Sequence, residues 1–484
     1  MSYSTKPEST QDHLLSVAAR VQASQTAFIE GKTAYTYATL YSQSEHIALT
    51  LLNRGIKRGQ VVALGHLPPR EMIIAIWACM LGGFIVFPLN IRFPKTILVQ
   101  ILTDINPALI ISDTSYPGIE VFPFGKLSMV ENEPNMSKLP VFNQFAAASL
   151  LMTSGSSGHT KIVEHSHSNH IESALGSNQN ILLTSSDSWV LSLPLYHVGG
   201  LSILFRCALA GAAIVIPGSQ HSLLSDIEMQ RATHISLVAT QFQRLLQDKS
   251  GPKILQNMKA ILLGGSAITP DLIQKALDNK LPFHVSYGST EMASQITTTT
   301  QNNREAALQN SGGILPGRDL IISHEGEILV KGNTLARGYF ESSGLVDLRD
   351  KNGWFHTGDV GYTNVHGELT VTGRMDNQFI SGGENVQPEH IERILCNIPV
   401  VLNAIIIPQA DDEFGNRPVA FLEIQPDSID GEEISQLLRN QLPGYMLPTA
   451  YYELPTAVVA QGLKISRKEL TNLLVTKNKH LHSL

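Results

Sequence analysis

The chain has 484 residues, of which 43% are hydrophobic and 16% charged, and its formal net charge is −7. This length exceeds that of one compact core and predicts about two to four structural units at roughly 100–200 residues each. The mildly acidic balance excludes the basic field with which proteins bind nucleic acid or an anionic membrane. Three widely separated cysteines argue against a disulfide framework or a zinc site and predict buried thiols in a reducing cytoplasm.

Up to about residue 311, strand-like apolar runs alternate with amphipathic helical segments. A helix is expected over residues 38–54, and the strands are expected at 61–65, 84–87, 108–112, 188–194, 212–218, 234–240 and 260–266. Residues 72–89 carry no charge and reach the lower edge of membrane-span length. Gly82, Gly83 and Pro88 interrupt them, so we expect a buried helix that ends near Leu81, a turn and a strand. This alternation predicts layered α/β subdomains with mostly parallel sheets.

The pattern changes twice further along the chain. Short runs separated by glycine, at 326–332 and 367–374, predict antiparallel hairpins or a small β-barrel-like subdomain over about 312–374. Helices at 388–397 and 431–442 and strands at 403–408 and 418–425 then predict a small α+β domain. We therefore expect a multi-domain α/β protein, with a large N-terminal domain over 1–374 and a C-terminal domain over 375–484. The N-terminus has no apolar core for a signal peptide.

Residues 153–161, TSGSSGHTK, follow the apolar run AAASLLM. Small residues let backbone N–H groups approach phosphate oxygens, and Lys161 adds a positive charge. A Walker A loop would need G-x-x-x-x-G-K-[ST], whereas only two residues separate Gly158 from Lys161 here, and Ile162 follows. The chain is therefore not an ordinary P-loop NTPase. Taken alone, the run favours a flexible surface turn over a phosphate-binding loop.

Two acidic motifs lie downstream. In YGSTEM, residues 287–292, Glu291 follows a short strand, where α/β enzymes bind ligands, and a carboxylate suits Mg²⁺ that bridges phosphates. The alternative is a helix N-cap with a glutamate in the first turn. In GWFHTGDVGY, residues 353–362, Asp359 is either a turn residue or a bidentate acceptor, and His356 is expected to be structural.

Together with GRMDNQFISGGENVQPEHIE at 373–392 and AQGLKISRKEL at 460–470, these motifs resemble the acyl-CoA synthetase and adenylate-forming superfamily. The resemblance runs in order over nearly the whole chain. Ser157 replaces a threonine of the family loop and keeps its hydroxyl, whereas Thr160 replaces a proline. The resemblance implies an acid–CoA ligase that uses ATP, Mg²⁺ and coenzyme A. The acid would attack the α-phosphate and release pyrophosphate, and the CoA thiol would then attack the acyl-adenylate.

The resemblance also implies residue roles. Lys464, Thr290 and Glu291 would be catalytic, and Glu291 would also hold Mg²⁺. Asp376 would be the hinge about which the C-terminal domain turns, and Gly382 and Gly383 would leave room for the pantetheine arm of CoA. The residues implied in ATP binding are Thr153, Ser154, Gly155, Ser156, Ser157, Gly158, Lys161, Gly264, Gly265, Ser266, Tyr287, Gly288, Asp359 and Arg374.

Within the superfamily, residues 194–212, 292–298, 379–392 and 462–470 resemble a subfamily that activates an aromatic dicarboxylic acid. The carboxylate that is not activated is a fixed anion and should meet a cation. Arg206 lies in the apolar stretch LSILFRCALAGA, where an unpaired charge is costly, and a guanidinium fits a benzoate carboxylate. A structural pairing with an acid elsewhere is the alternative. His197, Ser294 and Thr297 are expected to complete the pocket.

Three other functions stay open at this point. The chain would be another aryl- or fatty-acyl-CoA ligase, a stand-alone adenylation module that loads a carrier protein, or a non-catalytic nucleotide-binding protein of the same fold. The expected partners are small molecules, with no nucleic acid and no membrane span. A homo-oligomer is compatible with the sequence.

Overall fold

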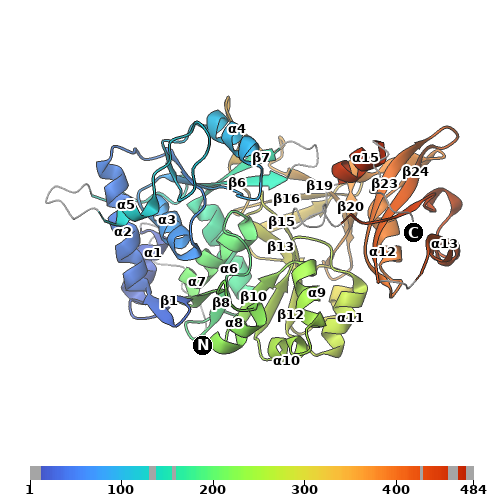
Figure 1. The fold of residues 1–484 in the computed structure, drawn as a ribbon, viewed down its shortest axis with the longest axis horizontal. Helices are drawn as coiled ribbons and strands as arrows, with labels where there is room; N and C mark the ends of the chain where they lie inside the picture. The colour runs from blue at the N-terminus through green and yellow to red at the C-terminus, as the bar shows by residue number, and fades with distance from the viewer. Residues whose placement is uncertain (1–11, 130–137, 155–159, 426–428, 456–466, 476–484) are drawn as a thin grey trace.

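The computed structural model describes residues 12–129, 138–154, 160–425, 429–455 and 467–475 (Figure 1). Two large sheets and their helices form the main body, and the C-terminal residues, coloured orange to red, project to one side. Strands buried on both faces account for the continuous apolar runs of the N-terminal half. The predicted multi-domain α/β fold class is confirmed.

The larger sheet has nine strands in the order β14-β13-β12-β11-β10-β8-β9-β1-β2. Its middle is parallel, and its strands there are β1 (Thr26–Glu30), β9 (Ala213–Ile216), β8 (Ser188–Val190), β10 (His234–Leu237), β11 (Ala260–Leu263) and β12 (Phe283–Ser289). Antiparallel strands close both edges, namely β2 (Thr33–Thr36), β13 (Ser294–Thr298) and β14 (Gly313–Ile314). The parallel middle places several strand ends at one edge of the sheet, as α/β enzymes require for ligand binding.

The second sheet has seven strands in the order β18-β17-β7-β6-β4-β3-β5. The strands of this sheet that come earliest in the chain are β3 (Val61–Leu64), β4 (Ile85–Pro88), β5 (Leu109–Ile111), β6 (Ala147–Ser154) and β7 (Thr160–Ser166). Two strands from much later in the chain complete it, β17 (Gly338–Glu341) and β18 (Gly344–Val346). No periodicity in the sequence predicted that these late strands would join this sheet.

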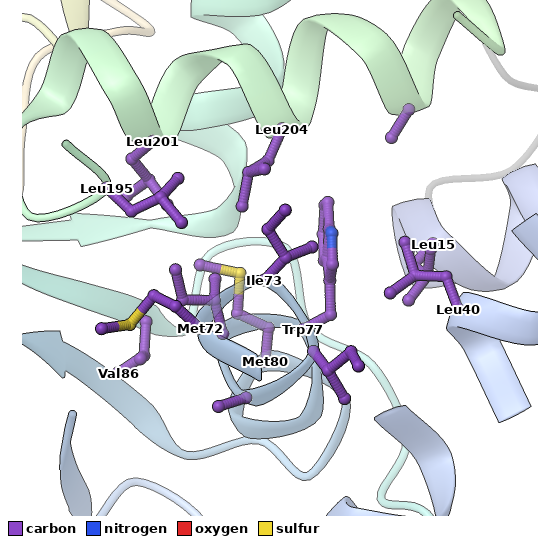
Figure 2. Close-up of a cluster of buried hydrophobic side chains, with 14 of the residues drawn as sticks. Leu15, Leu40, Met72, Ile73, Trp77, Met80, Val86, Leu195, Leu201 and Leu204 are labelled. Atoms are coloured by element: carbon purple, nitrogen blue, oxygen red, sulfur yellow. The ribbon is translucent and has the colours of Figure 1, made fainter. Parts of the chain in front are cut away.

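The helices of the main body cover and separate these sheets. They are α1 (Leu14–Val21), α2 (Tyr37–Asn53), α3 (Pro69–Leu81), α4 (Lys95–Ile105), α5 (Phe124–Ser128), α6 (His167–Asn180), α7 (Val198–Ala210), α8 (Leu223–Gln230), α9 (Ala239–Gln247), α10 (Gly251–Gln256) and α11 (Pro270–Asp278). Figure 2 shows Trp77 and Ile73 of α3 between Leu204 of α7 and Leu15 of α1, all buried in the largest hydrophobic cluster.

Helix α3 confirms the interpretation of residues 72–89. Pro69 supplies the preformed first turn, the helix ends at Leu81, and β4 follows the glycine pair. No helix among the described residues is long and apolar enough to cross a membrane. All three cysteines are buried, as predicted, and burial raises the pKa of the Cys396 thiol to about 12.

Residues 318–332 and 355–374 form the predicted antiparallel hairpins. The strands β15 (Arg318–Ile322), β16 (Glu327–Gly332), β19 (Phe355–Thr363) and β20 (Leu369–Arg374) follow one another in an antiparallel sheet with β15 and β20 at its edges. The short helix η1 (Glu305–Leu308) precedes them.

The C-terminal part begins after β20 with the short helix η2 (Met375–Asn377). Its elements are β21 (Phe379–Ser381), β22 (Glu384–Val386), α12 (Pro388–Leu395), β23 (Val401–Asp411), β24 (Gly415–Ile424), α13 (Gly431–Arg439), η3 (Gly444–Met446), β25 (Tyr451–Glu453) and α15 (Arg467–Val475). Two hydrophobic clusters take all their members from Phe379 onward. Separate cores support the predicted domain boundary after residue 374.

Candidate functional site

The β6–β7 hairpin carries both ends of the predicted phosphate loop. Thr153 pairs with Lys161 in this hairpin, and Ser154 pairs with Thr160. The loop residues between these strands, Gly155, Ser156, Ser157 and Gly158, lie outside the described residues. The Lys161 ammonium lies 4.6 Å from the centroid of the Tyr339 ring, which belongs to β17.

The turn between β12 and β13 carries Thr290 and Glu291. The Thr290 carbonyl oxygen lies 2.7 Å from Nε2 of His165, and the Glu291 Oε1 accepts a hydrogen bond from the Tyr339 hydroxyl at 3.0 Å. Gly288 precedes the turn, and a Cβ there would collide with the Ser294 carbonyl oxygen. The turn is therefore fixed by contacts with side chains of β7 and β17 and by the pairing of β12 with β13.

Glu291 is a single carboxylate with one oxygen already oriented by a phenol. Among the described residues, no group of three or more His, Cys, Asp or Glu side chains could hold a metal ion alone. Mg²⁺ is commonly bound through one or two carboxylates and the phosphates of its substrate. A single carboxylate therefore fits Mg²⁺ that arrives with ATP.

Three residues predicted to bind ATP meet at Asp359. The Tyr287 hydroxyl donates to Oδ2 of Asp359 at 2.6 Å, and Arg374 donates to Oδ1 at 2.9 Å. Arg374 also donates to Oδ1 of Asp376 at 2.8 Å. Burial, reinforced by the Asp359 charge, raises the pKa of Tyr287, so its phenol remains a donor at neutral pH.

Arg206 is a buried cation in the middle of α7, only 1% exposed. Its Nη2 donates to Oε1 of Gln295 at 2.9 Å and to Oγ of Ser294 at 3.2 Å, and its guanidinium lies 5.2 Å from the Trp189 ring. Its Nε and Nη1 have no hydrogen-bond partner among the described residues, and no described carboxylate forms an ion pair with it. Burial lowers its pKa to about 9, so the group stays charged at neutral pH.

A buried guanidinium with two unmet donors is costly unless an anion completes it. Around it, Ser294 has a backbone φ of 121°, which is rare for a residue with a side chain. The Thr297 hydroxyl donates to the Ser311 carbonyl at 2.9 Å, and the His197 ring packs against Tyr196 at the start of α7. The pocket roles predicted for these residues stay predictions.

The remaining predicted residues lie on two turns and one undescribed segment. Gly264, Gly265 and Ser266 follow β11, and a Cβ on Gly264 would come 2.7 Å from Oγ of Ser286. Gly382 and Gly383 form the left-handed turn between β21 and β22, where the Gly382 N–H donates to the Phe414 carbonyl at 2.9 Å. Lys464 lies outside the described residues.

Among the side chains that contact predicted site residues, sequence reasoning missed Tyr339, His165 and Gln295. Gln295 directly follows Ser294 in the chain, so the sequence already showed that it lies next to a predicted site residue. His165 stands four residues after Lys161 on β7, but its contact with Thr290 crosses 125 positions. Tyr339 had no signal in the sequence, because only the pairing of β17 with β7 brings it to the site.

Comparison with known proteins adds three findings from sequence and two from structure. The family described as AMP-binding enzyme matches residues 15–340. The 2-succinylbenzoate–CoA ligase of Escherichia coli K12 is 32% identical over 436 residues, covering 89% of this chain and 91% of that protein. Its counterpart in Haemophilus influenzae is 38% identical over 353 residues, covering 71% and 75%.

Two solved structures have nearly the same fold. The o-succinylbenzoate CoA synthetase (MenE) of Bacillus subtilis, in complex with the acyl-adenylate intermediate OSB-AMP, has a TM-score of 0.84 and 27% identity, covering 95% of this chain and 98% of that one. The same protein in complex with ATP and magnesium ion has a TM-score of 0.81 and 28% identity, covering 91% and 95%.

Proposed function

Because this chain belongs to the AMP-binding enzyme family, and relatives that match most of its length are 2-succinylbenzoate–CoA ligases, we propose that it performs that reaction. It is an AMP-forming acid–CoA ligase. It activates 2-succinylbenzoate through an acyl-adenylate and transfers the acyl group to coenzyme A. The products are 2-succinylbenzoyl-CoA, AMP and pyrophosphate, in the biosynthesis of menaquinone.

The observation that carries the choice of substrate is Arg206. 2-Succinylbenzoate has a succinyl carboxylate that reacts and an aromatic carboxylate that does not. The second carboxylate must enter the site as an anion, and the two unmet donors of the buried guanidinium supply the charge and hydrogen bonds that it needs. A fatty acid would leave this cation uncompensated, so the geometry favours the dicarboxylic acid.

The other predicted residues bind different parts of Mg²⁺-ATP. Asp359 accepts hydrogen bonds from the ribose hydroxyls, and the loop with Lys161 holds the β- and γ-phosphates. Mg²⁺ bound at Glu291 would neutralise phosphate charge. Thr290 contacts the α-phosphate, and Lys464 stabilises the charge that builds there as the acid attacks.

The second half-reaction uses the C-terminal domain. Rotation about Asp376 withdraws Lys464 and brings Gly382 and Gly383 toward the adenylate, where the CoA thiol attacks. The ion pairs of Arg374 with Asp359 and Asp376 support this proposal, because they link the proposed hinge residue to a residue of the proposed ribose site. The three free, buried thiols support the proposal that the protein acts in the reducing cytoplasm. Light scattering on the purified protein would test the open prediction of a homo-oligomer.

A panel of acids tests this function. Purified protein is incubated with ATP, Mg²⁺, CoA and one acid, and thioester and AMP are measured. The acids are 2-succinylbenzoate, the analogue without the ring carboxylate, benzoate and a medium-chain fatty acid. We expect 2-succinylbenzoate to be preferred strongly. Preference for another acid would identify a different ligase. Transfer only to a carrier protein would identify a loading module, and no adenylate from any acid would indicate a non-catalytic protein.

A further inference from the structure

Strand β17 is held beside β7 in a defined register. Tyr339 pairs with Val163 and Gly338 pairs with Glu164. Arg337 reinforces this register, because its N–H donates to the Glu164 carbonyl and its guanidinium forms an ion pair with the Glu164 carboxylate, each at 2.8 Å. The side chain of Tyr339 is thereby placed diagonally across from Lys161, on the strand that leaves the predicted phosphate loop.

Tyr339 contacts two groups of opposite charge with two different parts of its side chain. Its ring face lies under the Lys161 ammonium at 4.6 Å, and its hydroxyl donates to Oε1 of Glu291 at 3.0 Å. A tyrosine hydroxyl is protonated at neutral pH, so it donates this hydrogen bond to the carboxylate. One half-buried residue therefore connects the phosphate-loop strand with the Thr290–Glu291 turn.

Both contacts leave the charged groups free to bind a ligand. An ammonium that lies over an aromatic face still has N–H donors to offer to phosphate oxygens. A carboxylate that accepts one hydrogen bond on Oε1 retains further lone pairs for a cation. A direct Lys161–Glu291 ion pair would instead consume both charges, whereas in the structure each of these two side chains contacts Tyr339.

We propose that Tyr339 is a positioning residue for the magnesium–triphosphate part of ATP. Its hydroxyl orients Glu291 toward the cation, and its ring orients Lys161 toward the β- and γ-phosphates. This proposal rests on the proposed function for the identity of the nucleotide, and it adds a residue to which no role has been assigned above.

The two contacts differ in strength, so they can be separated. Losing a hydrogen bond to a charged group weakens binding by about tenfold or more. Losing a partly exposed cation–π contact weakens it by about two- to fivefold. Tyr339→Phe removes only the hydroxyl, whereas Tyr339→Leu removes the ring as well.

The experiment measures ATP binding by calorimetry in excess Mg²⁺ and in EDTA, without acid or CoA. For Tyr339→Phe we expect affinity for ATP with Mg²⁺ to fall about tenfold, and affinity in EDTA to stay within about twofold. For Tyr339→Leu we expect an additional loss of about two- to fivefold under both conditions. Tyr362→Phe is the matched control, because Tyr362 is 55% exposed on β19 and its substitution should change neither value.

Two results would overturn the proposal. Unchanged Mg²⁺ dependence in Tyr339→Phe would remove the role of the hydroxyl, and equal affinities of the Phe and Leu variants in EDTA would remove that of the ring. Glu291→Gln with and without Tyr339→Phe gives a second test that needs no Leu variant. The proposal requires that Tyr339→Phe add little loss once the Glu291 charge is absent. Normal Mg²⁺-dependent ATP binding without thioester formation would refute the ligase function and leave this inference standing.

Discussion

Arg374 donates a hydrogen bond to Asp359 at 2.9 Å across the paired strands β19 and β20. Tyr287 donates to the other oxygen of the same carboxylate, so hydrogen bonds to both oxygens fix the orientation of Asp359. Arg374 is also the last residue before η2 and pairs with Asp376. The proposed ribose site and the proposed hinge therefore share one arginine.

Asp359→Asn should weaken ATP binding by about tenfold or more, since the variant loses the charge and one of its two acceptor oxygens. Calorimetric titration with ATP measures this change. Tyr287→Phe keeps the charge and removes one hydrogen bond, so we expect a smaller loss. Equal ATP affinity of Asp359→Asn and the parent protein would show that the carboxylate does not contact the nucleotide.

Arg206→Met should lower kcat/KM for 2-succinylbenzoate by about 30-fold to 5000-fold, because truncating one partner of a buried charge pair costs about 2–5 kcal/mol. Steady-state thioester formation provides the measurement. The analogue without the ring carboxylate is the control substrate, and its turnover should change much less. If both acids lose activity equally, Arg206 supports the fold and not the substrate carboxylate.

Lys464→Ala should reduce adenylate formation by about 100-fold to 1000-fold, because it removes a cation from the developing charge at the α-phosphate. Thioester formation from supplied acyl-adenylate should continue, and single-turnover assays separate the two halves. Lys468→Ala, on the exposed side of α15, is the matched control. A similar loss in both half-reactions would contradict the rotation about Asp376.

Stability should depend on the protonation of His165. Burial lowers its pKa to about 4, so the folded protein keeps it neutral while the unfolded chain binds a proton near pH 6.5. The contribution of neutral His165 to the free energy of unfolding is present above pH 6.5. It falls by about 2 kcal/mol as the pH is lowered from 7 to 5. Urea unfolding at both values should show a smaller fall for His165→Gln, whose amide also donates to the Thr290 carbonyl.

His356 provides the control of opposite sign. Its hydrogen bond to Glu327 raises its pKa, so its contribution is present below the unfolded value and is lost as the pH rises through the folded one. His356→Gln should therefore remove stability mainly at low pH. Identical pH dependence of both histidine variants would refute the assignment of neutral His165.

Local structure followed closely from the sequence. The helix expected over residues 38–54 is α2 (Tyr37–Asn53), and the segment 72–89 folded as a buried helix, a turn and β4. Hydrophobic pattern and glycine position are local signals, and they decide conformation over a few residues. Strand ends were less accurate, since β23 (Val401–Asp411) extends beyond the expected 403–408 because its long pairing with β24 continues.

By itself, the sequence determined which chemical groups are present and in what order: a small-residue loop with Lys161, then Glu291, then Asp359. Only the tertiary structure decided which of them share a neighbour. Periodicity records whether a strand is buried, but it does not record which distant strand it pairs with. The contacts of Tyr339 with Lys161 and Glu291 arise because β17 adds to the edge of a sheet begun almost three hundred residues earlier.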